Sequence, residues 1–220
     1  MGLDDKAPAH LNTYLGIREL ILCGDLVPGQ PVTIQGLVGT LNAGMTPVRE
    51  ALRRLTAEGA LRFHDNRRIT VPVLTIAEVD ELIFARLALE PELARRGAAR
   101  MRAPDIARLE EIDQHLDRAM QTGNIRDYML FNHRFHAAIY AAAGTVVIEP
   151  LVDALWLRSA PALRVMCARF GAQSLPDMHR AALTAMRAGD AAAVAEAIRA
   201  DILQGLENVR ALIAEGAPLV

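Results

Sequence analysis

The sequence predicts a mainly α-helical protein with two domains: an N-terminal unit of three helices and a hairpin, residues 1–75, and a six-helix bundle, residues 76–220. Composition supports this, because 52% of the 220 residues are hydrophobic but only 4% are aromatic, which favours helices over sheets. Spacing supports it too. Short amphipathic segments separated by Gly and Pro turns give way near residue 75 to long Ala-, Leu- and Arg-rich segments with a helical period.

The first two helices are predicted over residues 11–23 and 34–41. Apolar residues recur along the first with an approximate helical period, and Gly24 follows as the residue that ends the helix. A Pro-Gly pair then marks a turn. Thr33 can cap the second helix, although its two internal glycines should each cost about 1 kcal/mol relative to Ala.

A third helix is predicted over residues 45–55, with Thr46 as its N-cap and Pro47 in its first turn. Its two faces are distinct. The apolar stripe consists of Val48, Ala51, Leu52 and Leu55, and the opposite stripe consists of Thr46, Arg49, Glu50 and Arg53. The tight turn at residues 42–44 joins two short helices, which is the helix-turn-helix layout.

A hairpin is predicted from two β-prone runs, residues 60–64 and 68–73. Pro72 cannot donate to a ladder, so the second run is expected to be an edge strand or to leave the sheet there. The tip carries His64, Arg67 and Arg68, a polar and basic group suited to a phosphate backbone. Three helices and this hairpin make a winged helix-turn-helix. A solvated charged surface would give the same pattern on both the helix and the tip.

The bundle begins with a capping box at Thr75 and Glu78, which opens a long helix through roughly residue 102. The domain boundary is therefore expected near residue 75. Five further helices are predicted over residues 104–123, 124–143, 148–170 with a kink at Pro161, 176–188 and 190–213.

Charge and cysteine usage exclude several classes of protein. A net charge of −2 argues against a protein that coats nucleic acid with its whole surface. Cys23 and Cys167 lie far apart in apolar surroundings, so buried free thiols are expected. No stretch is long and apolar enough for a membrane span, and no basic leader precedes an apolar run, so a soluble cytoplasmic protein without a membrane partner is expected.

At this point the sequence resembles the GntR family of bacterial transcription regulators, in the FadR branch with an FCD effector-binding domain. The winged-helix side of the resemblance is carried by Gly24-Asp25-Leu26-Val27-Pro28-Gly29, Thr46-Pro47-Val48-Arg49-Glu50-Ala51-Leu52 and Glu58-Gly59. The FCD side is carried by Arg86-Leu87-Ala88-Leu89-Glu90, Asn132, Phe135-His136, Ala143-Gly144, His179 and Gly189-Asp190. It covers residues 11–210.

The resemblance implies a homodimer whose third helices enter successive major grooves of a double-stranded, palindromic DNA operator, with half-sites ~34 Å apart. A repressor is the commoner expectation. The expected DNA contacts are Thr46, Arg49, Arg53, His64, Arg67 and Arg68. The chain departs from the family at Gly44-Met45, where Ser or Thr followed by Arg is usual, and at Arg68, where the wing tip usually has Gly.

The resemblance also implies a divalent metal such as Zn²⁺, held by an acid or amide, the His four residues later, and one His from each of two later helices. Those positions are Asn132, His136, His179 and Asp201. The usual Asp is Asn132 here and the usual last His is Asp201, so an N₂O₂ ligand set is expected. The alternatives are ordinary interior or surface histidines, expected for His115 and His133, and pairing of Asp201 with a buried Arg.

The resemblance further implies that Arg86, His136 and His179 face one pocket inside the bundle, where a small carboxylate effector is expected, with the planar guanidinium of Arg86 clamping the carboxylate. The expected function is a ligand-responsive transcription regulator and not an enzyme. Two alternatives stay open. One is a metal-dependent helical-bundle enzyme that uses His136 and His179, although no general acid or base is spaced to serve it. The other is a helical protein-interaction module that has lost DNA binding.

Overall fold

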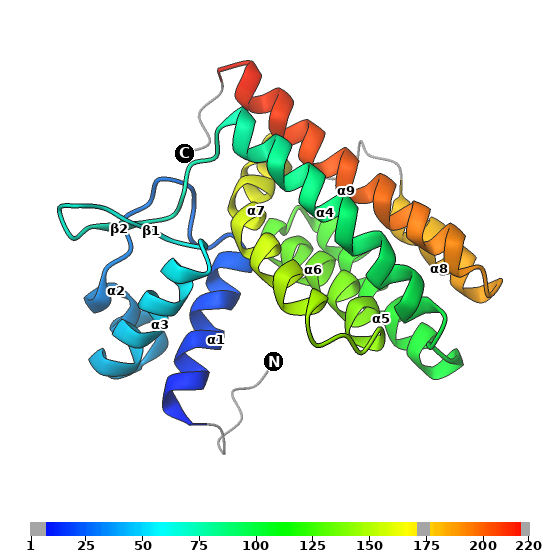
Figure 1. Cartoon of the computed structure of the whole chain (residues 1–220), viewed down its shortest axis with the longest axis horizontal. Helices are drawn as coiled ribbons and strands as arrows, with labels where there is room; N and C mark the ends of the chain where they lie inside the picture. The colour runs from blue at the N-terminus through cyan, green and yellow to red at the C-terminus, as the bar shows by residue number, and fades with distance from the viewer. Residues whose placement is uncertain (1–7, 171–176, 217–220) are drawn as a thin grey trace.

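The structure is a computed structural model, which describes residues 8–170 and 177–216. It confirms the predicted fold class: a small unit with a hairpin lies at one end of the molecule and long helices fill the other end (Figure 1). The elements of the small unit are α1 (Ala9–Leu22), α2 (Ile34–Leu41), α3 (Met45–Ala57), β1 (Arg62–Phe63) and β2 (Ile69–Thr70).

The core of the small unit is formed by the predicted apolar stripe of α3 against α1. All four apolar residues of that stripe are buried, and so are Ile17 and Ile21 of α1. α3 starts at Met45 as predicted, but its N-cap differs from the prediction. Gly44, not Thr46, is the N-cap, because its carbonyl already accepts from Val48 N at 3.3 Å, so Thr46 lies inside the first turn. Pro47 fits there because a first-turn N–H has no intrahelical partner.

The turn between α2 and α3 has the predicted helix-turn-helix layout. The hydroxyl of Thr33 accepts from Gly36 N at 3.1 Å and caps α2 as expected. Asn42 ends α2 in the left-handed region, with φ 48°, a conformation that Asn tolerates better than most residues. The chain therefore turns into α3 within three residues.

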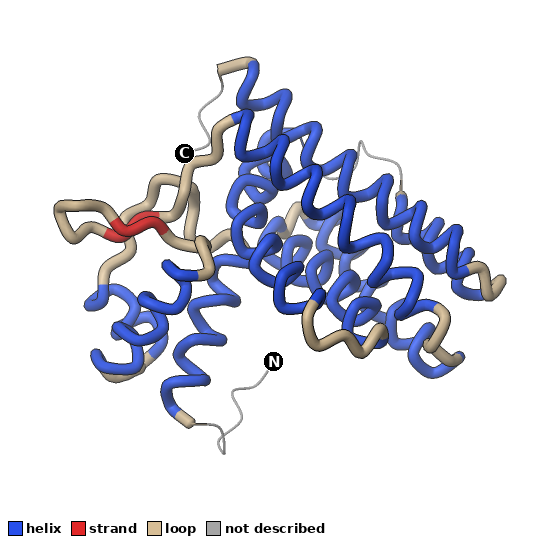
Figure 2. Tube along the Cα trace, viewed as in Figure 1, coloured by secondary structure: helices blue, strands red, loops and turns tan. Residues whose placement is uncertain are grey.

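The hairpin is shorter than predicted, and of the two outcomes expected for its second strand the second holds. β1 and β2 are antiparallel, with Arg62 opposite Thr70 and Phe63 opposite Ile69 (red in Figure 2). β2 is not an edge strand, because Pro31 bridges to Thr70 on its other side. The chain leaves this pairing at Pro72, as its missing N–H requires. The left-handed residue of the tip is Arg67, with φ 62°, and not Arg68.

The predicted six helices follow, within the residues that the structure describes. Their bounds are α4 (Ile76–Ala98), α5 (Ala103–Thr122), α6 (Ile125–Ala142), α7 (Ile148–Phe170), α8 (Met178–Arg187) and α9 (Ala191–Ala214). The capping box is confirmed by Thr75 N donating to Glu78 at 2.8 Å and Glu78 N donating to the Thr75 hydroxyl at 3.3 Å.

Two helix ends differ from the prediction. α4 ends at Ala98 and not near residue 102, because the chain turns and Arg102 becomes the N-cap of α5. Asp177 caps α8 by accepting from Arg180 N at 2.9 Å, while Pro176, the predicted first residue of that helix, lies outside the described residues. In the described portion of the chain, no helix is long and apolar enough to cross a membrane.

Helices α4 and α9 run side by side along the bundle (Figure 1), and α6 and α7 also pack against α4. One close approach between α4 and α6 depends on a glycine. A Cβ atom at Gly97 would overlap the backbone carbonyl of Ile139, so any larger residue would have to separate the two helices.

Helix α7 joins the bundle to the small unit. Arg18 of α1 pairs with Asp153 at 3.0 Å, and Arg158 Nε donates to the backbone carbonyl of Glu58 at 3.1 Å. The turns after α1 and α3 lie directly on α7 side chains. A Cβ at Gly24 would overlap Arg164 and a Cβ at Gly59 would overlap Arg158, and both glycines have positive φ.

We predict opposite effects for two Gly→Ala substitutions inside helices. Gly97→Ala should lower the free energy of unfolding by about 1–3 kcal/mol, because an overpacked core must shift to admit the methyl group. Gly39→Ala, in α2 with no atom near its would-be Cβ, should raise it by about 0.5–1 kcal/mol through helix propensity. Urea unfolding of both variants measures this. Equal effects would contradict the close approach of α4 and α6.

Candidate functional site

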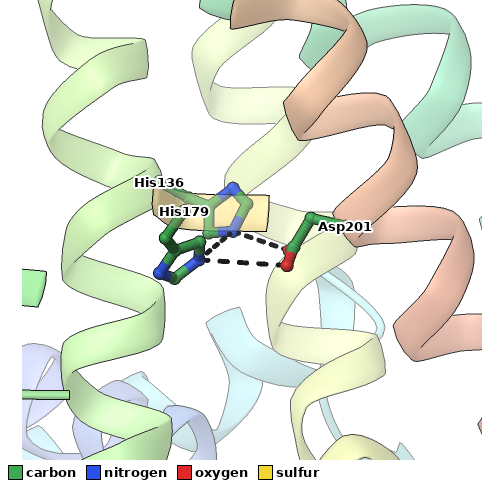
Figure 3. Close-up of side chains that lie close together, drawn as sticks. All are labelled: His136, His179 and Asp201. Atoms are coloured by element: carbon green, nitrogen blue, oxygen red, sulfur yellow. Dashed lines mark hydrogen bonds and ion pairs between the residues drawn. The ribbon is translucent and has the colours of Figure 1, made fainter. Parts of the chain in front are cut away.

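Three of the predicted metal ligands meet inside the bundle: His136, His179 and Asp201 (Figure 3). His136 Nε2 lies 3.0 Å from Asp201 Oδ2 and 3.3 Å from His179 Nε2, and His179 Nε2 lies 4.0 Å from Asp201 Oδ1. The residues come from α6, α8 and α9, so the cluster joins three helices that are distant in sequence.

Packing holds both imidazole rings in place. His136 is fully buried on α6, and His179 is the second residue of α8, just after its cap. The ring of Phe135 stacks on the ring of His179 with centroids 4.0 Å apart and planes at 10°. Both rings therefore have little freedom to turn their Nε2 atoms away from Asp201.

The hydrogen bonds of Tyr140 determine which nitrogen of His136 carries a proton. The Tyr140 hydroxyl donates to Glu90 Oε2 at 2.7 Å, so its oxygen can only accept from His136 Nδ1, which is 3.0 Å away. In neutral His136, the proton is then on Nδ1 and the lone pair is on Nε2. That lone pair faces the other two members of the cluster.

His179 is oriented by a second acidic residue. Its Nδ1 lies 3.4 Å from Asp113 Oδ1, and a carboxylate can only accept there. The Nε2 of neutral His179 therefore also presents a lone pair. A carboxylate behind a ligating histidine is the arrangement that usually fixes the tautomer at protein metal sites.

The cluster thus brings together three atoms that present lone pairs, and such an arrangement needs a cation between them, either a proton or a metal ion. Bonds of 2.0–2.1 Å to a tetrahedral Zn²⁺ place neighbouring ligand atoms about 3.3 Å apart. The observed separations of 3.0, 3.3 and 4.0 Å lie around that value. The donor set therefore fits a divalent metal with three protein ligands and one further coordination position.

The pKa shifts follow from burial and from these contacts. Burial lowers the pKa of His136. Burial alone would also lower the pKa of His179, but the hydrogen bond to Asp113 and the charges of Asp201 and Asp113 outweigh it and raise that pKa. Burial would raise the pKa of Asp201, yet its contacts with the histidines lower it to about 2, so the carboxylate is ionised.

Arg86 is close to this cluster but does not point a free guanidinium at it. It forms a two-pronged ion pair with Glu90, one turn further along α4, and its Nη1 donates to Ser159 at 3.2 Å. Trp156 stacks on the guanidinium at 4.3 Å and donates its Nε1–H to Glu90 at 3.1 Å. The carboxylate that Arg86 clamps in this structure is therefore that of Glu90.

A cavity of about 270 Å³ opens beside the cluster. Its polar lining consists of Arg86, Asp117, Asn132, Asp177, His179, Arg180, Asp201 and Gln204. Its apolar lining consists mainly of Leu and Met side chains. Asn132, the fourth predicted ligand, lines this cavity one turn before His136. The cavity thus brings Asn132, His179, Asp201 and Arg86 to one space, whereas His136 lies behind it.

Two other histidines lie apart from the cluster, and one alternative for Asp201 is wrong. His115 stacks on Phe131 with centroids 4.7 Å apart, and burial lowers the pKa of His133 to about 3. Among the described residues, no ion pair joins Asp201 to an arginine. The partner of Asp201 is His136, because the buried Arg86 is taken by Glu90.

Glu90, Tyr140 and Asp113 contact the predicted site residues, although none of the three was itself predicted to have a role there. Two of them carried a sequence signal. Glu90 stands four residues after Arg86, and Tyr140 stands four residues after His136, so each pair shares a helix face. Asp113 carried no such signal, because its contact with His179 joins α5 to α8.

The predicted nucleic-acid contacts lie at the surface of the small unit. Arg49 and Arg53 are exposed on α3, and within the described residues neither side chain has an ion-pair or hydrogen-bond partner. Arg54 differs, because it pairs with Glu58 at 2.9 Å and stacks on the ring of Tyr14. Thr46 is also exposed, and so are the tip residues His64, Arg67 and Arg68.

Comparison with known proteins gives two family matches. Residues 10–71 match the gntR family of bacterial regulatory proteins, and residues 81–204 match the FCD domain. The HTH-type transcriptional regulator McbR of Escherichia coli K12 is 28% identical over 150 residues, 68% of each chain. The HTH-type transcriptional repressor RspR of the same strain is 25% identical and covers 98% of this chain and 95% of its own. A solved structure of E. coli McbR/YncC has a TM-score of 0.84 at 25% identity, covering 96% of this chain and 99% of that one.

We predict that Glu90→Gln lowers the free energy of unfolding by about 3–5 kcal/mol, because it leaves the charge of Arg86 buried without its partner. The matched control is Glu92→Gln, on the same helix, which removes exposed pairs with Arg95 and Arg96 and should have little effect. Urea unfolding compares the two. A similar loss in both variants would argue against a special role for the buried pair.

Proposed function

This chain belongs to the GntR family of bacterial transcription regulators and carries an FCD domain, and from that premise we propose that it binds a palindromic operator as a homodimer and changes its DNA affinity when a small organic acid binds the bundle. The family consists of regulators and not enzymes, so the alternative of a metal-dependent enzyme is set aside. We assign DNA binding to residues 1–75 and effector binding to residues 76–220. The capping box that begins at Thr75 supports this division.

The single observation that supports DNA recognition by α3 is that two of its arginines are exposed and have no partner in the described chain, whereas a third is paired. Arg49 and Arg53 are exposed and unpaired among the described residues, while their neighbour Arg54 is held by Glu58 and Tyr14. A guanidinium with free N–H groups can reach a phosphate or the O6 and N7 atoms of guanine. This also argues against a protein-interaction module that has lost DNA binding. The basic tip of the hairpin supports a further contact with the phosphate backbone.

A homodimer is supported by large apolar side chains that the single chain leaves exposed. Phe84 on α4 is 77% exposed, and Val146 and Val147, just before α7, are 88% and 68% exposed. Leu151 in the first turn of α7 is also exposed. Helices α4 and α7 pack against each other, and exposed apolar groups on neighbouring elements are typical of a subunit interface. We propose that a second copy covers these side chains.

For the metal, we propose that His136, His179 and Asp201 are ligands of a divalent ion such as Zn²⁺, with Asn132 at the edge of the site. The three converging lone-pair atoms support this. A bound ion would supply a positive centre for an effector carboxylate. The Leu and Met side chains around the cavity would enclose the apolar portion of the effector. Arg86 would reach the effector carboxylate only if its ion pair with Glu90 rearranged.

Helix α7 supports a route from the cavity to the DNA-binding domain. Its Trp156 and Ser159 contact the buried pair of Arg86 and Glu90. Its Asp153 and Arg158 contact the winged helix, at Arg18 and at the backbone of Glu58. Two conformations that place α7 differently would also place the winged helix differently. A ligand that binds one of these conformations more tightly would increase its population.

DNA binding is tested on genomic fragments that the wild-type protein retains in a selection. We expect Arg49→Ala to weaken binding about 5- to 150-fold, as loss of a bidentate base contact worth about 1–3 kcal/mol implies. The matched control is Arg108→Ala, an exposed arginine of α5, which should bind like the wild type. Gel shifts between 50 and 200 mM salt measure the affinity of both variants. If the wild type makes ~6–10 phosphate contacts, raising the salt over that range should weaken its binding ~10³–10⁵-fold. Failure of the wild type to retain any fragment would overturn the proposal.

The metal is tested by elemental analysis after loading with Zn²⁺ and gel filtration. We expect about one equivalent per chain in the wild type and in His115→Ala, whose ring lies outside the cluster. The double variant His136→Ala/His179→Ala removes both nitrogen ligands and should retain no Zn²⁺. Equal metal content in all three proteins would contradict the ligand assignment.

A further inference from the structure

We propose that Asp113 is the positioning residue of the metal site and supplies the second negative charge that the site lacks at Asn132. This inference rests on the proposed metal site. Asp113 lies on α5 and is only 8% exposed, and its Oδ1 is 3.4 Å from Nδ1 of His179. Among the described residues, no arginine or lysine pairs with it, so His179 is its ion-pair partner.

A count of the buried charges shows why a second carboxylate is needed. The charges of Arg86 and Glu90 cancel in their own ion pair. Of the cluster in Figure 3, only Asp201 is acidic, and Asn132 is neutral. A divalent ion held by two neutral histidines and Asp201 would leave one positive charge uncompensated in a buried site, which is unfavourable at low dielectric. Asp113 brings the sum to zero through His179.

The position of Asp113 also explains how it acts without touching the ion. A carboxylate that accepts from Nδ1 keeps the lone pair of His179 on Nε2 and makes that nitrogen a better donor. Asp113 therefore orients the ligand and adds charge at once. A carboxylate at position 132 would add its charge directly at the cavity. An acidic residue at 132 should therefore replace the negative charge that is lost when Asp113 is neutralised.

Asp117 is a matched control on the same helix. It lies one turn after Asp113 and lines the cavity, but its nearest charged partner is Arg180 at 4.0 Å, and no hydrogen bond or ion pair joins it to a histidine of the described chain. If any acidic residue near the cavity could raise the Zn²⁺ affinity, removing the charge of Asp117 should lower that affinity as much as removing the charge of Asp113. If the contact with His179 is required, removing the charge of Asp117 should leave the affinity unchanged.

The test measures the Zn²⁺ affinity of the whole chain by competition with a chromophoric chelator. We expect Asp113→Asn to bind Zn²⁺ 10- to 100-fold more weakly, the usual effect of losing such an outer partner. Asp113→Glu should stay near the wild type, and so should Asp117→Asn. The double variant Asp113→Asn/Asn132→Asp should recover most of the lost affinity, which a purely structural role of Asp113 would not produce. Circular dichroism of the metal-free proteins checks that each variant folds.

An Asp113→Asn affinity equal to that of the wild type would overturn the inference while leaving the metal site in place. Loss of affinity in Asp113→Asn without recovery in the double variant would also overturn the inference, because the loss would then not come from the missing negative charge. If the wild type itself binds no Zn²⁺, the proposed metal site fails, and this inference fails with it. The DNA-binding proposal is unaffected by any of these results.

Discussion

The carboxylate of Glu90 is the group on which the bundle depends. It accepts from Arg86 of its own helix, from Tyr140 of α6 and from Trp156 of α7, so one buried charge joins three helices. A buried ion pair of this kind adds little net stability, but its loss is severe because one charge is then left alone. It also fixes geometry. The Tyr140 hydroxyl donates to Glu90 and can therefore only accept from Nδ1 of His136, so the structural centre and the candidate metal site share one hydrogen-bond chain.

That hydrogen-bond chain connects regions of different character within the bundle. Around Glu90 the polar atoms are paired with one another and carry no net charge. Around His136, His179 and Asp201 three potential ligand atoms converge, an arrangement that fits a shared proton or a metal ion. Tyr140 and Trp156 each contact both regions, so the buried ion pair and the candidate metal site are packed as one unit.

Most of the fold could be predicted from the sequence, because its signals are local. The buried stripe of α3, the capping box at Thr75 and the glycines that end helices depend on residues a few positions apart. The N-cap of α3 could not be predicted, since Thr46-Pro47 is a strong local cap signal and yet the N-cap is Gly44. The residues of the site also differ in whether their contacts are local in the sequence. Tyr140 and Glu90 follow their partners by one helical turn, whereas the contact of Asp113 with His179 exists only because α5 packs on α8.

The joint between the winged helix and the bundle combines two kinds of contact. Backbone of the small unit, at Glu58 and at the glycine turns of positions 24 and 59, meets long arginine side chains of α7. Charged side chains of the small unit also form ion pairs with α6 and α7, and these are Arg18, Glu19 and Asp25. A foreign winged helix would therefore have to supply both glycines and all three charges to meet the same surface, so substitutions on the two sides of the joint are coupled.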